Sequence, residues 1–271
     1  MPELPEVETT RLGLSPHVQG QTIRTAVVRN PRLRWPVPKH LAQLVAGRRI
    51  ERLERRSKYL LLDCGGGWLI LHLGMSGSLR VVPADQPPGA HDHLDIVLES
   101  GQALRLHDPR RFGAVLWQRG EPTRNKLLRD IAPEPFDPRF DGHWLFQHTR
   151  GRRAAIKNLL MDQRLVCGVG NIYANESLFR AGIHPATAAG RIGEQRYARL
   201  VDAIRTTLTE AIRAGGSTLR DFVNADGKPG YFQQQYFVYG RAGEPCRLCA
   251  SAVRMVRIGQ RSAFYCPRCQ R

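Results

Sequence analysis

Four cysteines near the C-terminus follow a C-x2-C-x16-C-x2-C pattern, formed by Cys246, Cys249, Cys266 and Cys269. Two pairs of thiolates, each on a tight turn, can complete a tetrahedral zinc site. The alternative is two disulfides, which are unfavourable in a cytosolic chain of this size. Four sulfur ligands leave no open coordination position, so the spacing predicts one structural Zn²⁺ that closes a small module. The other two cysteines, Cys64 and Cys167, lie in apolar segments and are expected to be buried thiols.

Arginine dominates the charge of the chain. Forty-one Lys and Arg residues against 24 Asp and Glu give a formal net charge of +17, and all but five of the 41 are Arg. Guanidinium groups match phosphate oxygens and stack on bases, so the charge predicts a polyanionic partner, most simply nucleic acid. An arginine-rich proteome or a membrane-surface protein would also give this charge, but no basic amphipathic helix supports a membrane role. Arginines also flank the cysteines, at Arg247, Arg254, Arg257, Arg261 and Arg268.

Two features of the sequence argue against export or membrane insertion. No apolar run approaches the roughly 20 residues that a membrane-spanning helix needs. The first residues are acidic rather than basic, which is not typical of a signal peptide. We therefore expect a cytoplasmic protein without a membrane partner.

The chain changes character near its middle. Its first half holds one expected helix, 3–14, and short apolar runs separated by turn residues, at 22–29, 57–64, 68–75, 93–100, 103–108 and 114–118. Closely spaced short strands favour an antiparallel sandwich or barrel. A segment rich in proline, 132–142, reads as a linker. Beyond it, apolar residues recur at helical spacing in 154–163, 171–182 and 194–215, followed by a polar loop at 217–237.

Two local motifs admit a plain reading and a functional one. The chain opens MPELPEVE, and a proline and acids at this point are ordinary signals for the start of a helix. Gly168 and Gly170 precede Asn171 at the start of an expected helix. Gly-x-Gly-Asn by itself can be a turn with an Asn cap. Its position between two expected helices in the more basic half of the chain favours a phosphate contact at the free N–H groups of the helix start.

Taken together, these segments resemble the formamidopyrimidine-DNA glycosylase family. The resemblance rests on motifs that run through the chain in order: PELPEVE at 2–8, SKYLLL at 57–62, LHLGMSG at 71–77, HDH at 91–93, HDPRRFG at 107–113, MDQRLVCGVGNIYANE at 161–176 and FYCPRCQR at 264–271. It implies an α+β multidomain fold. We expect an N-terminal antiparallel β-sandwich with flanking helices over 1–133, a helix–two-turn–helix domain over 134–236 and a zinc finger over 237–271.

The resemblance also assigns catalytic roles. After removal of Met1, the secondary amine of Pro2 is the expected nucleophile, and Glu3 is the expected general acid at the sugar ring oxygen. Lys58 and Arg261 match family residues that contact phosphate and assist β- and δ-elimination, respectively. Glu6 matches an acid near the active site, although it could be only a first-turn acid.

Further residues fall where the family contacts DNA: His91, Arg152, Lys157, Asn171 and Tyr173. For His91 and Tyr173 a structural role is an equally simple explanation. Three other residues, Met75, Arg110 and Phe112, match the wedge that fills the space left by a flipped nucleotide, with Asp108 and Arg111 as supports. The plain alternative is that Met75 and Phe112 belong to the core and Arg110 to the surface.

The expected substrate is double-stranded DNA that contains oxidised purines such as 8-oxoguanine and formamidopyrimidines. The resemblance implies a monomer near the bacterial nucleoid, a capping loop with Ser217, Thr218 and Arg220 as candidates, and cytosine as the partner base read by Arg110. Two other functions remain open on sequence alone. One is a non-enzymatic zinc-finger DNA-binding protein, and the other is a metallonuclease with an open metal site at His91, Asp92 and His93.

Overall fold

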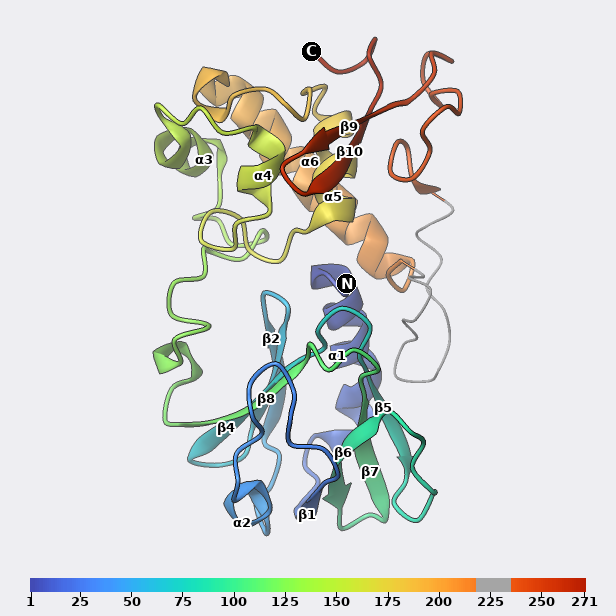
Figure 1. Ribbon diagram of the computed structural model, residues 1–271. Helices are drawn as coiled ribbons and strands as arrows, with labels where there is room; N and C mark the ends of the chain where they lie inside the picture. The colour runs from blue at the N-terminus through green and yellow to red at the C-terminus, as the bar shows by residue number, and fades with distance from the viewer. Residues whose placement is uncertain (218–234) are drawn as a thin grey trace. The chain divides into compact units, whose positions relative to one another are not determined.

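The computed structural model describes residues 1–217 and 235–271, and the chain divides into two compact units (Figure 1). The first unit contains Met1–Arg129 together with the described residues 214–217, and the second contains Asp130–Arg213 and the described residues 235–271. The domain boundaries expected at 133/134 and 236/237 stay predictions.

Two four-stranded antiparallel sheets form the framework of the first unit. One has the order β1–β6–β7–β5 and consists of β1 (Ile23–Val28), β6 (Asp92–Leu98), β7 (Gln102–His107) and β5 (Ser78–Pro83). The other has the order β2–β3–β4–β8 and consists of β2 (Arg52–Arg56), β3 (Tyr59–Asp63), β4 (Gly67–His72) and β8 (Ala114–Arg119). The antiparallel N-terminal architecture expected from the sequence is therefore confirmed.

The apolar faces of both sheets share one core. Strands β3 and β4 are apolar over most of their length and are buried almost throughout, as their sequences YLLLD and GWLILH suggest. The core contains Leu60 and Leu71 from one sheet and Leu94 and Leu104 from the other. Strands β2 and β5 were not predicted from the sequence, because Arg and Glu dominate β2 and because β5 ends on a proline.

Helices α1 (Leu4–Val18) and α2 (Leu41–Val45) flank the sheets, and a 3-10 turn, η1 (Pro122–Arg124), follows β8. Helix α1 begins with a capping box in which Glu3 and Glu6 each accept the other's backbone N–H. It buries Val7, Leu14 and Val18, and it extends past the expected end at residue 14 with Pro16 inside its last turn. The helix continues through this last turn because its apolar side chains pack into the core.

The second unit is built from helices and ends in a β-hairpin. Its elements are α3 (Gly142–Thr149), α4 (Ile156–Leu160), α5 (Asn171–Arg180), η2 (Ala189–Arg191), α6 (Glu194–Arg213), β9 (Arg254–Ile258) and β10 (Arg261–Tyr265). Helix α6 packs against α3 and α5. Helix α3 was not expected from the sequence, and its start is fixed by the side chain of Asp141, which accepts a hydrogen bond from Trp144 N at 2.7 Å.

Helix α5 anchors the C-terminal segment. The buried carboxylate of Glu176 accepts backbone N–H bonds from Phe237, Val238 and Tyr239 at 2.8, 3.0 and 2.8 Å. Asn175 Oδ1 accepts a bond from Phe264 N in β10 at 2.7 Å. The contacts of Glu176 attach residues 237–239 to the helix, and that of Asn175 attaches the hairpin. Among the described residues, the structure contains no helix with the length and apolarity needed to cross a membrane.

Candidate functional site

The N-terminus of the chain is surrounded by buried charge. Pro2, Glu3 and Glu6 are buried at the start of α1, and Glu3 N donates to Glu6 Oε2 at 2.8 Å. The other oxygen of Glu6 accepts a bond from Ser217 N at 2.8 Å. Burial lowers the pKa of the N-terminal ammonium of Met1, the nearby charges of Glu3 and Glu6 oppose this, and those of Lys58 and Arg110 add to it. An amine with a lowered pKa has a larger neutral, nucleophilic fraction at neutral pH.

Lys58 lies in the tight turn between β2 and β3 and is buried. The preceding residue, Ser57, has a left-handed backbone with φ of 55°. Arg55 holds this turn, because its Nη1 donates to Ser57 O at 2.9 Å and its Nε pairs with Glu8 Oε2 of α1 at 2.8 Å. The Arg55–Glu8 pair therefore fixes Lys58 relative to the N-terminus. This pair was not predicted, because the sequence of a charged strand does not indicate which carboxylate its arginine contacts.

His72, at the end of β4, is a second residue that the sequence analysis missed. Its ring lies 4.9 Å from that of Tyr59, measured between centroids, and its Nδ1 accepts a bond from Gly74 N at 3.0 Å. Burial lowers the pKa of His72 to about 4, and the charges of Lys58 and Arg34 act in the same direction. The imidazole is therefore neutral at physiological pH. In the sequence, His72 could have been identified by its position in the motif LHLGMSG.

The turns that carry Met75 and Phe112 touch each other through their backbones. A Cβ on Gly74 would lie 2.5 Å from the carbonyl carbon of Phe112, so only glycine permits this approach. Phe112 is 47% exposed, which shows that it is not a core residue. Arg110 and Arg111 are also exposed.

Asp108 stabilises the turn that carries Phe112. The Asp108 side chain is fully buried, and its Oδ2 accepts a bond from Gly113 N at 2.7 Å. Burial raises the pKa of Asp108, and bonds from the backbone of Gly113, Arg111 and Arg110 oppose that rise. Its backbone oxygen accepts a bond from Arg111 N at 3.1 Å, and Arg111 adopts a left-handed φ of 57°. The turn thus presents Phe112 on a braced backbone.

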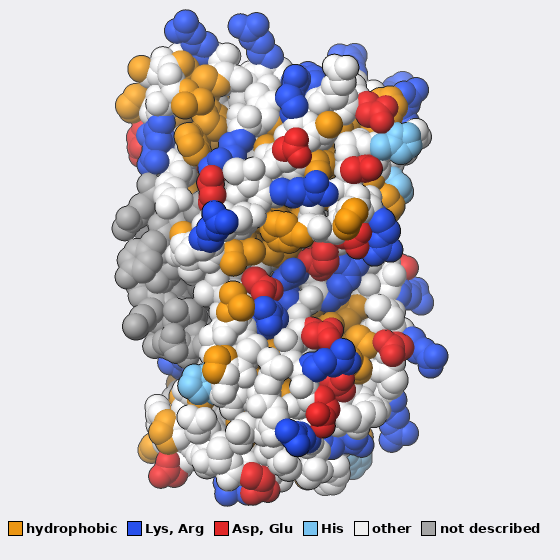
Figure 2. All heavy atoms as spheres, turned by 180° about the vertical axis from the view of Figure 1, so that it is seen from behind, with side chains coloured by type: hydrophobic (Ala, Val, Ile, Leu, Met, Phe, Trp, Pro, Cys, Tyr) orange, Lys and Arg blue, Asp and Glu red, His pale blue; other side chains and the backbone are white. Residues whose placement is uncertain are grey.

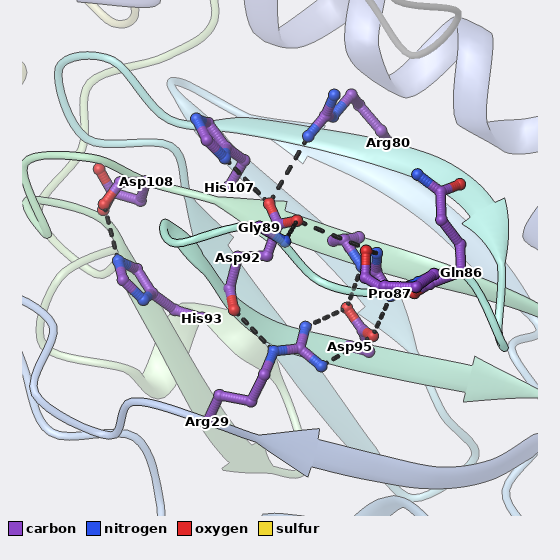
Figure 3. Close-up of polar contacts among 11 residues, drawn as sticks. Arg29, Arg80, Gln86, Pro87, Gly89, Asp92, His93, Asp95, His107 and Asp108 are labelled. Atoms are coloured by element: carbon purple, nitrogen blue, oxygen red, sulfur yellow. Dashed lines mark hydrogen bonds and ion pairs between the residues drawn. The ribbon is translucent and has the colours of Figure 1, made fainter.

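The HDH segment places one histidine outward and one inward. His91 is exposed, whereas His93 is buried and its Nε2 lies 2.9 Å from Asp108 O. The carboxylate of Asp92 is engaged by Gly89 N at 2.8 Å and by His107 Nδ1 at 2.9 Å. Both oxygens of Asp92 and Nε2 of His93 therefore have hydrogen-bond partners within the fold (Figure 3).

In the second unit, a glycine-containing loop leads into α5. Gly168 has a φ of 78°, and Asn171 begins the helix after Gly170. Free N–H groups of a first helical turn favour an anion. Tyr173 is fully buried, so it has no exposed surface to offer DNA in this structure and packs inside the second unit. Arg152 is exposed near the end of α3, where its Nε donates to His148 O at 3.0 Å.

Lys157 is also fully buried, and its ammonium donates to Ser262 O at 2.9 Å. Ser262 follows Arg261 in β10, so Lys157 helps to hold the hairpin that carries this arginine. Arg261 itself is exposed beside the turn at Gly259, which has a φ of 60°.

The four spaced cysteines converge as a metal site requires. All four Sγ atoms lie within 4.8 Å of one another, with Cys246 to Cys269 at 4.0 Å and Cys249 to Cys266 at 3.4 Å. Tetrahedral zinc with Zn–S bonds of about 2.3 Å needs sulfurs about 3.8 Å apart. Backbone N–H groups of Leu248 and Cys269 point at sulfurs from 3.5 and 3.4 Å, as expected for thiolates. The cluster therefore fits one structural zinc.

Comparison with known proteins agrees along the whole chain. The sequence matches the formamidopyrimidine-DNA glycosylase N-terminal domain over residues 1–115, the H2TH domain of the same glycosylase over 131–223, and the zinc finger found in FPG and IleRS over 243–271. The formamidopyrimidine-DNA glycosylase of Syntrophotalea carbinolica is 59% identical over 271 residues and both chains are covered completely.

The chain belongs to the formamidopyrimidine-DNA glycosylase family. Two solved structures are similar to it. The MutM (FPG) protein of Thermus thermophilus has a TM-score of 0.89 at 42% identity and covers 99% of this chain and 98% of its own. Lactococcus lactis FPG, in a complex with a Fapy-dG containing DNA, has a TM-score of 0.90 at 34% identity and covers 99% of this chain and all of its own.

Membership of this glycosylase family confirms the resemblance, the fold class and the zinc finger. In the first unit, the charges of Glu3, Glu6, Lys58 and Arg110 all act on the N-terminal amine, next to Pro2. It places Lys157, Asn171 and Arg261 in the second unit. The roles assigned to individual residues stay predictions. Lys and Arg side chains are spread over the face shown in Figure 2, so charge alone does not locate the glycosylase site.

Proposed function

We propose that this glycosylase excises oxidised purines from duplex DNA with the amine of Pro2 and then cleaves the strand. The observation that carries the proposal is the start of the chain, where Pro2, Glu3 and Glu6 are buried. The half-buried ammonium of Met1 has a lowered pKa there, and the charges of Glu3, Glu6, Lys58 and Arg110 act on it. Removal of Met1 would put the secondary amine of Pro2 at this position. The names of the relatives and the Fapy-dG containing DNA bound by the Lactococcus lactis protein support the substrate class.

The chemistry proceeds through an iminium. The lone pair of Pro2 forms a bond to C1′ of the damaged nucleotide and the glycosidic bond breaks. The base leaves with the electron pair of the glycosidic bond and takes up the proton that the Pro2 nitrogen loses. Glu3 donates a proton to the sugar ring oxygen, which opens the sugar and leaves the positive charge on nitrogen. This charge acidifies the C2′ proton. Loss of that proton expels the 3′ phosphate by β-elimination, and a second proton loss expels the 5′ phosphate by δ-elimination.

Other side chains prepare the substrate for this attack. Lys58 and Arg261 contact the phosphates that leave. The flanking strand, or the elements that contact it, is held by His91, Arg152, Lys157, Asn171 and Tyr173. Extrusion of the nucleotide costs a few kcal/mol for each unstacked step. Met75, Arg110 and Phe112 offset this cost by filling the vacated space, and Arg110 reads an opposing cytosine. Ser217 is buried beside Glu6, whereas Thr218 and Arg220 lie outside the described residues.

The partner in this proposal is damaged double-stranded DNA, bound by one copy of the protein near the nucleoid in the cytoplasm. A monomer suffices because one chain supplies both the amine and the basic finger. Light scattering of the protein with and without a lesion duplex measures this stoichiometry. One protein to one duplex is expected, and two proteins to one lesion would contradict it.

Trapping with borohydride tests the proposed activity against its rivals. A duplex with one 8-oxoguanine opposite cytosine, incubated with the full-length protein and borohydride, should yield a covalent protein–DNA adduct. A zinc-finger binding protein would retain the duplex without an adduct. A metallonuclease would cut without an adduct and would stop when a chelator removes an exchangeable metal. Either of these two results would contradict the proposal.

A further inference from the structure

His107 carries an imidazole that the proposed chemistry does not use. It ends strand β7, beside Asp92 of the paired strand β6. Its Nδ1 lies 2.9 Å from Asp92 Oδ1, and its side chain is 31% exposed. The ring of exposed His91 packs edge-on against it, with 5.8 Å between centroids. Two accessible imidazoles therefore lie side by side where β6 begins and β7 ends.

Asp92 fixes the tautomer of His107. An ionised carboxylate only accepts hydrogen bonds, so the proton of the neutral imidazole resides on Nδ1 and the Nε2 lone pair faces away from Asp92. Burial opposes ionisation of Asp92, but bonds from Gly89 N and His107, with the charge of Arg80, leave its pKa lowered. When His107 gains a second proton, Nε2 becomes a cationic donor directed away from the carboxylate.

The charges around His107 come from three strands and one loop (Figure 3). Arg80 of β5 and Arg105 of β7 lie 3.6 and 3.9 Å from Asp92, and Arg105 also pairs with Asp95 of β6 at 2.8 Å. Arg29 pairs with the other oxygen of Asp95 at 2.6 Å. Three guanidinium groups thus pair with two carboxylates, which leaves one excess positive charge in this cluster, and Arg80 and Arg29 are its partly exposed cations.

We propose that His107 binds a phosphate of the DNA backbone beside His91, and that Asp92 orients it for this contact. The inference rests on the proposed function, in which His91 faces the DNA. A phosphate near Nε2 favours the imidazolium because it supplies both an acceptor and a negative charge. DNA binding then takes up a proton at His107, and affinity increases as the pH falls.

The test measures the affinity of the full-length protein for a duplex with a tetrahydrofuran abasic analogue, from pH 5.5 to 8.5 at constant ionic strength. His107→Gln removes the titrating group and retains a polar side chain. In the variant, the slope of log Kd against pH should decrease by up to one, which corresponds to one proton fewer taken up on binding. At the lowest pH, its slope of log Kd against log salt should decrease by about one, as expected for one lost phosphate contact. His40→Gln, an exposed histidine at the start of α2, is the matched control and should retain both slopes.

Ring resonances of His107, followed by NMR in the wild-type protein, give a second measurement that depends on no variant. The pKa of His107 should be higher in the duplex complex than in the free protein. Equal values in both states, or unchanged slopes for His107→Gln, would overturn the inference. Failure of the wild-type protein to bind or trap the lesion duplex would instead contradict the proposed function.

Discussion

The N-terminal centre of the first unit and the finger of the second unit position their functional residues by different means. Around the amine, backbone caps, the carboxylate of Glu6 and the Arg55–Glu8 pair hold the local structure. The finger has a small apolar core, and its four thiolates need a metal to offset their mutual repulsion. The nucleophile should therefore remain in place without zinc, whereas Arg261 should not.

Blocking the N-terminus should produce the largest effect. A variant that retains Met1, or that carries an N-terminal tag, has no free Pro2 amine and should lose excision by more than about 10³-fold, as expected when a nucleophile is removed. Affinity for an abasic-analogue duplex should stay within about threefold of that of the processed protein, because the side chains proposed to contact DNA are unchanged. A factor of three corresponds to less than about 1 kcal/mol. The same tag at the C-terminus is the control. Full excision by the N-terminally blocked protein would disprove the role of Pro2.

Removal of zinc should separate the two regions. Zinc contributes on the order of 10 kcal/mol to the folding of such modules, so the metal-free full chain should lose the structure of its finger. Hydrogen exchange at 254–265 should accelerate by more than about 10³-fold, while the amides of β3 and β4 retain their protection. Equal loss of protection in both regions would show that the first unit also depends on the metal.

Phe112→Ala should reduce excision about 10- to 100-fold, because the wedge offsets a few kcal/mol of unstacking. The free energy of unfolding should change by less than about 1 kcal/mol, since the side chain is 47% exposed. Phe136→Ala in the second unit, where the side chain is 45% exposed, is the matched control and should leave excision unchanged. Unfolding of the Phe112 variant would show that the residue serves the core.

Glu8→Gln should lower the free energy of unfolding by about 1 kcal/mol at neutral pH, because it removes the charge that pairs with Arg55. Burial opposes ionisation of Glu8, but Arg11 and Arg55 leave its pKa lowered in the folded protein. Its stabilisation is therefore complete above the unfolded pKa of about 4.3 and is lost as the pH falls through the folded value. Denaturation at several pH values measures both effects. Asp162→Asn, in the exposed pair with Arg164, should cost less than about 0.5 kcal/mol.

The sequence predicted most of the framework because its signals are local. Apolar runs indicated β3, β4, β6 and β7, helical spacing indicated α5 and α6, and cysteine spacing indicated the zinc cluster. Strand β2 was missed because its Arg and Glu residues find their partners in α1 and β3, which no local pattern reveals. Helix α3 was missed because it is short and follows a proline-rich segment.

The site was predictable as a set of residues but not as an arrangement. Motifs pointed to Pro2, Lys58 and Phe112, yet the exposure of Phe112 and the burial of Lys157 and Tyr173 depend on tertiary packing. The neutral state of His72 likewise arises from burial and from two cations distant in sequence. Linear patterns carry no information about such surroundings.

Mass spectrometry of the borohydride-trapped adduct identifies which nitrogen attacks the sugar. The protein, after removal of Met1, is trapped on an 8-oxoguanine duplex, digested with nuclease and protease, and the modified peptide is sequenced. We predict that the sugar remnant lies on the nitrogen of Pro2. A remnant on Lys58 or another lysine, with an unmodified N-terminal peptide, would contradict the account.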